Sequence, residues 1–224
     1  MQKKIIVWDL PLRMFHWLLV VSVVASIISG LIGGMAMTFH FLSGYCILAL
    51  LVFRWIWGFI GGHHARFVNF VAGPRRVVHH LQGGDEREAL GHNPLGSWSV
   101  MALLLVLTMQ VVSGLFANDE IFNEGPLASY ISDHQGTILT YYHTSIGLPI
   151  LYGLIGLHIT AILYYLIEKN KNLVMPMLRG VKDVDATHPA PRASNDTWKH
   201  RLLALGILGL GAALGVWVSH LGAP

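Results

Sequence analysis

The sequence has a single cysteine and few charged side chains, and both shortages exclude whole classes of protein. With only Cys46 in 224 residues, the chain has no intrachain disulfide, no cysteine-rich zinc cluster and no C-x-x-C-H site for covalent haem. Charged residues make up 12% of the chain, where a soluble domain carries roughly 25%. An ordinary soluble globular protein is therefore excluded.

Hydrophobic residues are abundant, at 54% of the chain, and they are gathered into long runs. A helix needs about 20 apolar residues to cross a bilayer core, and these runs lack the alternation of barrel strands. We therefore predict an all-α polytopic membrane protein. The predicted spans are 14–36, 39–61, 96–118, 137–167 and 201–220. The first run is too long for a signal peptide and lacks a cleavage site, so we expect it to remain as a span.

All fifteen Lys and Arg residues are predicted to lie on one side of the membrane. The opposite connection, at 118–136, contains four acids and no Lys or Arg. By the positive-inside rule the amino terminus is predicted to be cytoplasmic and the carboxyl terminus periplasmic. The net charge of +3 is thus explained by topology. A nucleic-acid partner is not expected, because the aromatic residues lie inside the apolar runs.

The predicted organisation is a four-helix core at 1–168, a cytoplasmic loop at 169–200, and a fifth helix with a short periplasmic tail at 201–224. The fifth run contains Gly211 and Gly215, at a spacing that lets membrane helices pack closely. This helix is expected to pack against the core, a partner or a second copy. A homo-oligomer through span five is one of these interpretations.

Four of the thirteen histidines lie within the first four predicted spans, where ionisable side chains are costly and usually functional. His143 and His158 on one helix are separated by about 22 Å along the axis and about 60° around it. His16 shares the inner depth with His158, and His40 shares the outer depth with His143. Facing histidines in a helix bundle can hold haem iron, so we predict two stacked bis-histidine sites. The alternative is that the histidines only bond neighbouring helices. Weaker candidates for the outer ligand are His134 and His220.

Other residues fit the same haem hypothesis. Arg54 returns to the face of His40 near the inner pair, where it is expected to neutralise a haem propionate. The alternative is that Arg54 snorkels to the membrane interface. Gly44 and Gly147 lie one turn from the outer histidines and are expected to leave room for a flat macrocycle, although membrane glycines often serve helix packing instead.

Four short stretches resemble a known family. They are VWDLPLRMFHW at 7–17, RWIWGFIG at 54–61, ARF at 65–67 and GHNPLG at 91–96. Together they resemble the bacterial cytochrome b561 family, most closely the branch of the b-type cytochrome subunits of nickel-iron hydrogenases. The resemblance covers the first four spans, and the fifth departs from it. It implies a four-helix core that binds two haem b groups, and the implied ligands are His16, His40, His143 and His158.

The resemblance also implies a quinone site near the inner haem, at the start of the third span. Asn93 is expected to hydrogen-bond a quinone carbonyl there, and His92 to exchange a proton. A second interpretation, which we weigh more heavily, is that Asn93 caps the helix that begins at Pro94. The two roles are compatible.

The leading hypothesis is a dihaem b-type cytochrome, embedded in the lipid of the bacterial inner membrane, that transfers electrons between quinone and a periplasmic redox partner. Expected partners are a c-type cytochrome, a hydrogenase or another dehydrogenase. The protein would then be the electron-transfer subunit of a respiratory-chain complex, such as a quinol:cytochrome c or hydrogenase:quinone oxidoreductase. The acidic connection is expected to dock a basic partner. Two alternatives stay open: a membrane anchor subunit without a quinone site of its own, and a histidine-relay transporter of protons or solutes.

Overall fold

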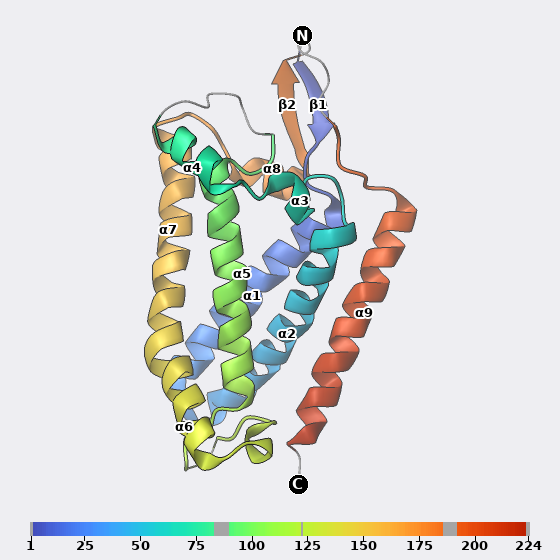
Figure 1. Ribbon diagram of the computed structural model, residues 1–224. Coiled ribbons are helices and arrows are strands. Elements are labelled where there is room, and N and C mark those ends of the chain that lie inside the picture. Colours follow the sequence, from blue (N-terminus) through green and yellow to red (C-terminus); the bar gives the residue numbers. More distant parts are fainter. Residues whose placement is uncertain (1, 83–89, 122, 186–191, 223–224) are drawn as a thin grey trace. The chain divides into compact units, whose positions relative to one another are not determined.

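The computed structural model describes residues 2–82, 90–121, 123–185 and 192–222 (Figure 1). Its long helices are α1 (Leu10–Ile32), α2 (Met37–Ile60), α5 (Pro94–Leu115), α7 (Leu148–Ile167) and α9 (Trp198–Leu221). A shorter helix, α6 (Asp133–Tyr141), leads into α7 through a π-helical turn at Tyr142–Gly147. Within the described residues, five helical segments have the length and composition of membrane spans. The predicted all-helical membrane fold is confirmed.

The helices begin and end within a few residues of the predicted positions, because local sequence sets their ends. Asp9 caps α1, since its Oδ1 accepts a hydrogen bond of 2.8 Å from the backbone N–H of Leu12. Gly33 and Gly34 follow α1 with φ angles of 66° and 55°, a conformation that favours glycine. Pro94 begins α5, where its missing N–H costs nothing.

The long helices carry large apolar side chains on their outer surfaces. Leu31 is 71% exposed, and Val21 and Trp217 are exposed to a similar degree. Such surfaces would be costly in water, whereas hydrocarbon solvates them. The protein is therefore a multi-pass membrane protein.

The chain forms two compact parts, and each long helix contributes residues to both. The first, which we call the basic part, comprises Met1–Phe15, Arg54–Ala102 and Gly156–Leu205, ranges that hold all fifteen Lys and Arg of the sequence. The second, the acidic part, comprises His16–Phe53, Leu103–Ile155 and Gly206–Pro224. The sequence of the acidic part holds four acids and no Lys or Arg.

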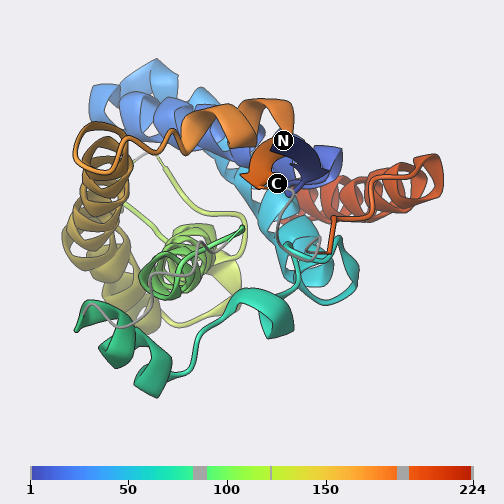
Figure 2. The ribbon, with the colours of Figure 1, turned by 90° about the horizontal axis from the view of Figure 1, so that it is seen from above.

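The basic part contains a pair of strands and three short α-helices. In it, β1 (Gln2–Ile6) pairs antiparallel with β2 (Val181–Asp185), with Gln2 opposite Asp185 and Ile6 opposite Val181. In Figure 2 the two strands, dark blue and orange, lie beside the label of the amino terminus. The sequence analysis predicted no strand, and it treated 169–200 as a loop. The short helices of this part are α3 (Phe67–Phe70), α4 (Pro74–Leu81) and α8 (Val174–Arg179).

Asp9 is the polar centre of the basic part. Its fully buried carboxylate accepts hydrogen bonds from Trp57 Nε1 at 3.3 Å and from the Gly62 N–H at 3.1 Å, besides the N–H of Leu12. A Cβ at Gly62 would lie 2.2 Å from Asp9 Oδ2, so glycine is required for this approach. Burial raises the pKa of Asp9, and the three hydrogen bonds oppose that rise.

In the acidic part, α9 packs on α2 of the same chain. A Cβ at Gly211 would lie 2.6 Å from the carbonyl oxygen of Ala49, and one at Gly215 would lie 3.2 Å from that of Tyr45. The two glycines therefore allow close helix packing. This glycine pair therefore packs within the chain, and a homo-oligomer through span five stays a prediction.

Candidate functional site

Two of the four predicted haem ligands lie together in the acidic part. His40 lies in the first turn of α2, and His143 lies in the π-helical turn before α7. The centroids of their imidazole rings are 6.0 Å apart, and the ring planes are almost perpendicular, at 89°. Both side chains are half-buried. The structure thus brings together the pair that the depth argument assigns to the outer haem.

Each of these rings is anchored through Nδ1 to a backbone carbonyl of a neighbouring helix. His40 Nδ1 donates to Ser26 O of α1 at 2.8 Å, and His143 Nδ1 donates to Gln110 O of α5 at 2.9 Å. Because a carbonyl can only accept, these bonds keep the proton on Nδ1 and leave a lone pair on Nε2. Metal-bound histidines are usually held in this way.

Glycines of α1 and α5 give the rings of His40 and His143 room to approach these two helices. A Cβ at Gly30 of α1 would lie 3.0 Å from His40 Nδ1. A Cβ at Gly114 of α5 would lie 2.7 Å from His143 Cε1, closer than atoms of this kind approach one another. The sequence analysis gave no role to Gly114, because only the packing of α5 against the π-helical turn reveals one.

The π-helical turn alters the geometry that a regular helix predicts. A π-turn holds about one residue more than an α-turn, and one residue corresponds to about 100° around the helix axis. The angle predicted between His143 and His158 therefore does not hold across Tyr142–Gly147. Such turns occur frequently at functional sites, and nothing in the hydrophobic pattern indicated this one.

Gln110 holds the backbone of the π-helical turn as well as the ring of His143. Its buried side chain donates a hydrogen bond from Nε2 to His143 O at 2.7 Å. Ser113 Oγ lies 3.4 Å from His143 Nδ1. Neither Gln110 nor Ser113 was predicted from the sequence to belong to the site. A polar Gln within an apolar run was the signal that could have found Gln110.

The two glycines predicted beside the outer haem, Gly44 and Gly147, differ in how closely other atoms surround them. A Cβ at Gly44 would meet nothing within 4 Å, so its role beside a macrocycle stays a prediction. A Cβ at Gly147 would lie 2.2 Å from Gln110 Oε1. Gly147 therefore allows α5 to approach the π-helical turn, which is the packing role weighed as the alternative.

The other two predicted ligands belong to different parts of the chain. His16 of α1 lies in the acidic part, and His158 of α7 lies in the basic part. Both side chains are half-buried, and the ring of His16 meets Trp17 edge-on with centroids 5.0 Å apart. The pairing of His16 with His158 stays a prediction.

Arg54 is buried, so the interpretation that it snorkels to the interface is wrong. Its side chain is 2% exposed, and its guanidinium lies over the rings of Phe67 and Phe70 of α3, 4.6 Å and 5.9 Å from their centroids. Among the described residues, Arg54 Nη1 has no hydrogen-bond partner. A buried cationic donor without a partner is costly, and it fits an anionic group such as a haem propionate.

Asn93 caps α5, as the more heavily weighed interpretation predicts. Its Oδ1 accepts a hydrogen bond of 2.6 Å from the Gly96 N–H, and its Nδ2 donates to the hydroxyl of Tyr165. The ring of His92 packs against Trp8 and Phe70, with centroid separations of 4.8 Å and 4.7 Å. A quinone contact by Asn93 stays a prediction, and Tyr165 is a neighbour that the sequence analysis did not identify.

The His40–His143 pair has the separation that one haem iron requires. Two imidazole nitrogens bound to opposite sides of a metal at about 2 Å each place the ring centroids roughly 6 Å apart. The observed separation is 6.0 Å. Within the described part of the chain, no group of three or more His, Cys, Asp or Glu side chains could hold a bare metal ion. Two histidines would suffice for a metal whose other ligands came from a porphyrin.

Comparison with known proteins identifies the family to which the chain belongs. The family model described as prokaryotic cytochrome b561 matches residues 7–180. The chain belongs to the prokaryotic cytochrome b561 family. Membership makes it a b-type membrane cytochrome, with haem b as the implied cofactor. The matched region contains all four predicted ligands, whereas α9 lies beyond it.

Curated relatives of this cytochrome are described as hydrogenase subunits. Proteins of Azotobacter vinelandii and Bradyrhizobium diazoefficiens, each described as a probable Ni/Fe-hydrogenase B-type cytochrome subunit, are 26% identical to it over 132 and 147 residues. The alignments cover 47% and 53% of this chain, and 55% and 58% of the relatives. The chain thus spans little more than half the length of these relatives. No solved structure matches it.

Proposed function

We propose that this cytochrome holds two haem b groups and transfers electrons between the quinone pool and a redox partner on the periplasmic side of the inner membrane. The observation that carries the proposal is the His40–His143 pair, with ring centroids 6.0 Å apart. Both Nδ1 atoms are bonded to backbone carbonyls. This arrangement supports ligation of one iron through the two Nε2 atoms.

Two histidine ligands favour electron transfer over oxygen chemistry. Haem b, when bound, supplies one-electron oxidation and reduction. If His40 and His143 both bound the iron, no position would remain at which oxygen or a substrate could coordinate. The carbonyls of Ser26 and Gln110 hold the two rings in one tautomer and one orientation, so little rearrangement accompanies a change of charge.

The second haem is proposed to be held by His16 and His158. Its support is their predicted common depth together with the family's ligand pattern. Arg54 adds independent support, because its buried guanidinium has an unpaired Nη1 among the described residues. A propionate beside Arg54 would neutralise that charge.

The partner is proposed to dock on the four acids of the acidic part. The family relatives named as hydrogenase subunits favour a nickel-iron hydrogenase, with a c-type cytochrome as the alternative. The docking acids, all exposed, are Asp119, Glu120, Glu124 and Asp133. Asp119 Oδ1 accepts a hydrogen bond of 2.8 Å from the Asn123 N–H, which shapes this loop. Transfer to a basic partner should slow as salt is added, and a salt-independent rate would contradict electrostatic docking.

Quinone is proposed to bind near Asn93 and Tyr165. Because Asn93 Oδ1 already caps α5, its Nδ2 and the Tyr165 hydroxyl are the groups that could meet a quinone carbonyl. Tyr165→Phe leaves the cap intact, and it is expected to raise the KM for quinone several-fold with an unchanged haem spectrum. An unchanged KM would contradict the site.

The orientation is also a proposal. The amino terminus and the basic part are placed on the cytoplasmic side by the positive-inside rule, and the carboxyl terminus on the periplasmic side. Fusion of alkaline phosphatase, which is active only in the periplasm, should give activity after residue 221 and none after residue 82.

The direct test is to count haem and record the reduced-minus-oxidised spectrum of the purified protein. We expect two haem b groups per chain. His40→Ala and His143→Ala should each remove the same one haem and leave the other. His134→Ala changes an exposed histidine of the acidic part and should keep both. A colourless protein would refute the proposal and favour a membrane anchor or a histidine relay, and a single haem in the unaltered chain would refute the dihaem arrangement.

A further inference from the structure

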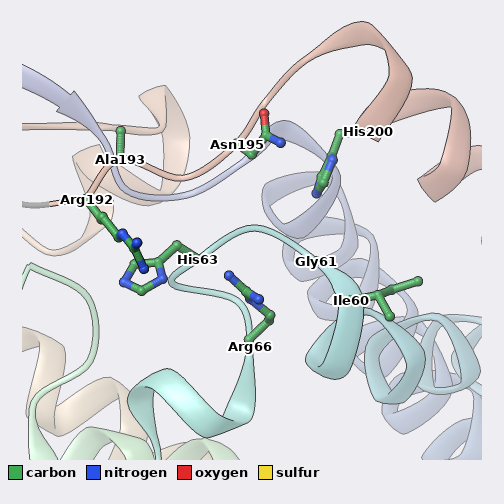
Figure 3. A pocket seen from close by; sticks show the side chains of 8 residues that line it. All are labelled: Ile60, Gly61, His63, Arg66, Arg192, Ala193, Asn195 and His200. Carbon is green, nitrogen blue, oxygen red and sulfur yellow. The ribbon is translucent and has the colours of Figure 1, made fainter.

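The basic part contains a pocket of about 330 Å³ that the proposed electron transfer does not use (Figure 3). Its polar side chains come from two segments far apart in the sequence. His63 and Arg66 follow α2, whereas Arg192 and Asn195 precede α9, and His200 lies in the first turn of α9. Figure 3 shows these side chains around a common space.

The lining of this pocket is cationic. Two guanidinium groups and two imidazoles line it, and none of its described lining residues is acidic. Nearby acids are engaged elsewhere, since Asp9 accepts a hydrogen bond from Gly62 N–H at 3.1 Å and Asp196 pairs with Arg201 at 2.9 Å. Nothing in the described lining therefore neutralises Arg66 and Arg192.

Several lining groups have hydrogen-bonding capacity that the protein itself does not use. Arg66 Nε and His200 Nε2 are buried and have no hydrogen-bond partner among the described residues. Asn69 Nδ2 donates to His63 Nδ1 at 2.9 Å, which leaves the proton of His63 on Nε2. Burial, followed by the charges of Arg66 and Arg192, lowers the pKa of His63. An anion in the pocket would satisfy these donors and relieve the repulsion.

The pocket lies beside the end of α2 and the start of α9. Ile60, one of its lining residues, is the last residue of α2, and His200 lies two residues after the start of α9. Beside them, Phe59 is 69% exposed and Trp198 is 66% exposed. Exposed aromatic side chains at helix ends are typical of the boundary between hydrocarbon and headgroups. A ligand at this place meets cationic donors and apolar surface together.

We propose that the pocket binds the phosphate group of an anionic phospholipid, with its oxygens held by Arg66, Arg192 and His200 and its acyl chains against the apolar ends of α2 and α9. Basic pockets between membrane helices are suited to such headgroups. Inorganic phosphate shares the anionic chemistry, but it would gain nothing from the exposed apolar surface beside the pocket.

The test is a titration of the purified full-length protein in a neutral detergent, with thermal unfolding as the readout. The three probes are phosphatidylglycerol, phosphatidylcholine with the same acyl chains, and inorganic phosphate. Phosphatidylglycerol is expected to raise the unfolding midpoint by several degrees, and the other two are not. An equal response to phosphatidylcholine would overturn the headgroup site, and an equal response to inorganic phosphate would overturn the lipid assignment.

Matched variants test the residues. Arg66→Gln combined with Arg192→Gln should weaken the apparent affinity for phosphatidylglycerol at least tenfold. The control, Arg75→Gln combined with Arg179→Gln, removes the same charge from exposed positions outside the pocket and should change the affinity less than twofold. Equal losses in both double variants would overturn the proposal, because net charge alone would then explain the binding.

A second measurement needs no variant. Native mass spectrometry of the unaltered protein, released from membranes of equal phosphatidylglycerol and phosphatidylcholine content, should show retained phosphatidylglycerol. Loss of both lipids, or retention in equal amounts, would overturn the proposal.

Discussion

The His40–His143 pair of the acidic part and three buried cationic side chains of the basic part differ in how their nitrogens are hydrogen-bonded. In the acidic part, the rings of His40 and His143 are both bonded to carbonyls of that same part. In the basic part, Arg54 Nη1, Arg66 Nε and His200 Nε2 are buried without a partner among the described residues. The acidic part has its own exception in Gln110 Oε1.

This difference follows from what each group is suited to bind. A metal ligand must present its lone pair in a fixed direction, so the protein satisfies the other ring nitrogen itself. A buried cationic donor left unpaired costs free energy until an anion arrives. The bonding of the His40–His143 pair thus suits the proposed metal ligands, whereas the unpaired buried cations of the basic part suit anions.

The largest effect on haem content is expected from a substitution of Gly114, which tests whether the position of the His143 ring matters. Gly114→Ala would place a methyl group 2.7 Å from His143 Cε1, so the ring must move off Gln110 O. We expect most molecules to lose the haem that His143 is proposed to ligate, as measured by haem content. The control is Gly153→Ala on α7, where a Cβ meets nothing within 4 Å. Full haem content in Gly114→Ala would show that this glycine does not position the ligand.

The contact between α9 and α2 should matter for stability and not for the metal site. Gly211→Leu would overpack the approach to Ala49 and is expected to lower the free energy of unfolding by about 1–3 kcal/mol. Haem content should stay unchanged, because none of the four predicted ligands lies on α9. Gly209→Leu, at a position where a Cβ meets nothing within 4 Å, should cost less in a denaturant titration. Similar losses in the two variants would contradict the packing argument.

Arg54 tests whether a buried cation of the basic part acts on one haem and not on the other. Arg54→Met removes a buried positive charge that favours an added electron, so one haem should fall in midpoint potential by on the order of tens of millivolts. The haem at His40 and His143 should keep its potential in the same redox titration. Arg75→Met, at an exposed position of α4, serves as the control. Equal shifts of both haems would remove the assignment of Arg54 to one site.

The smallest expected effect is a pH dependence from His64 of the basic part. Burial is the main cause that lowers the pKa of His64, and the charge of His63 adds to it, against the hydrogen bond to Arg192 O. The folded pKa of His64 lies below its unfolded value of about 6.5. The stability that comes from burying neutral His64 is therefore fully present above that pH, and it is lost as the pH falls below it. His64→Gln should flatten the dependence of the unfolding midpoint on pH. An unchanged slope would show that other groups dominate.

The spans and the proximity of His40 to His143 could be predicted because they depend on short-range rules. Apolar run length decides whether a helix crosses hydrocarbon, and a fixed rise per residue places His40 and His143 at one level. Asn93 as a cap followed equally from its place before Pro94. The burial of Arg54 could not be predicted, because the rings that cover it belong to α3, beyond the end of α2.

From the sequence alone came the membrane class, the five spans, the division of charge and the four candidate histidines, since composition and local periodicity determine these properties. Only the tertiary structure decided which carbonyls accept the imidazole protons of His40 and His143, which glycines lie beside these two rings, and where α9 packs. Those outcomes depend on contacts between helices, such as Gly114 with His143 or Gly211 with Ala49. Sequence separation carries no information about contacts of that kind, because neighbouring helices can meet at many angles and registers.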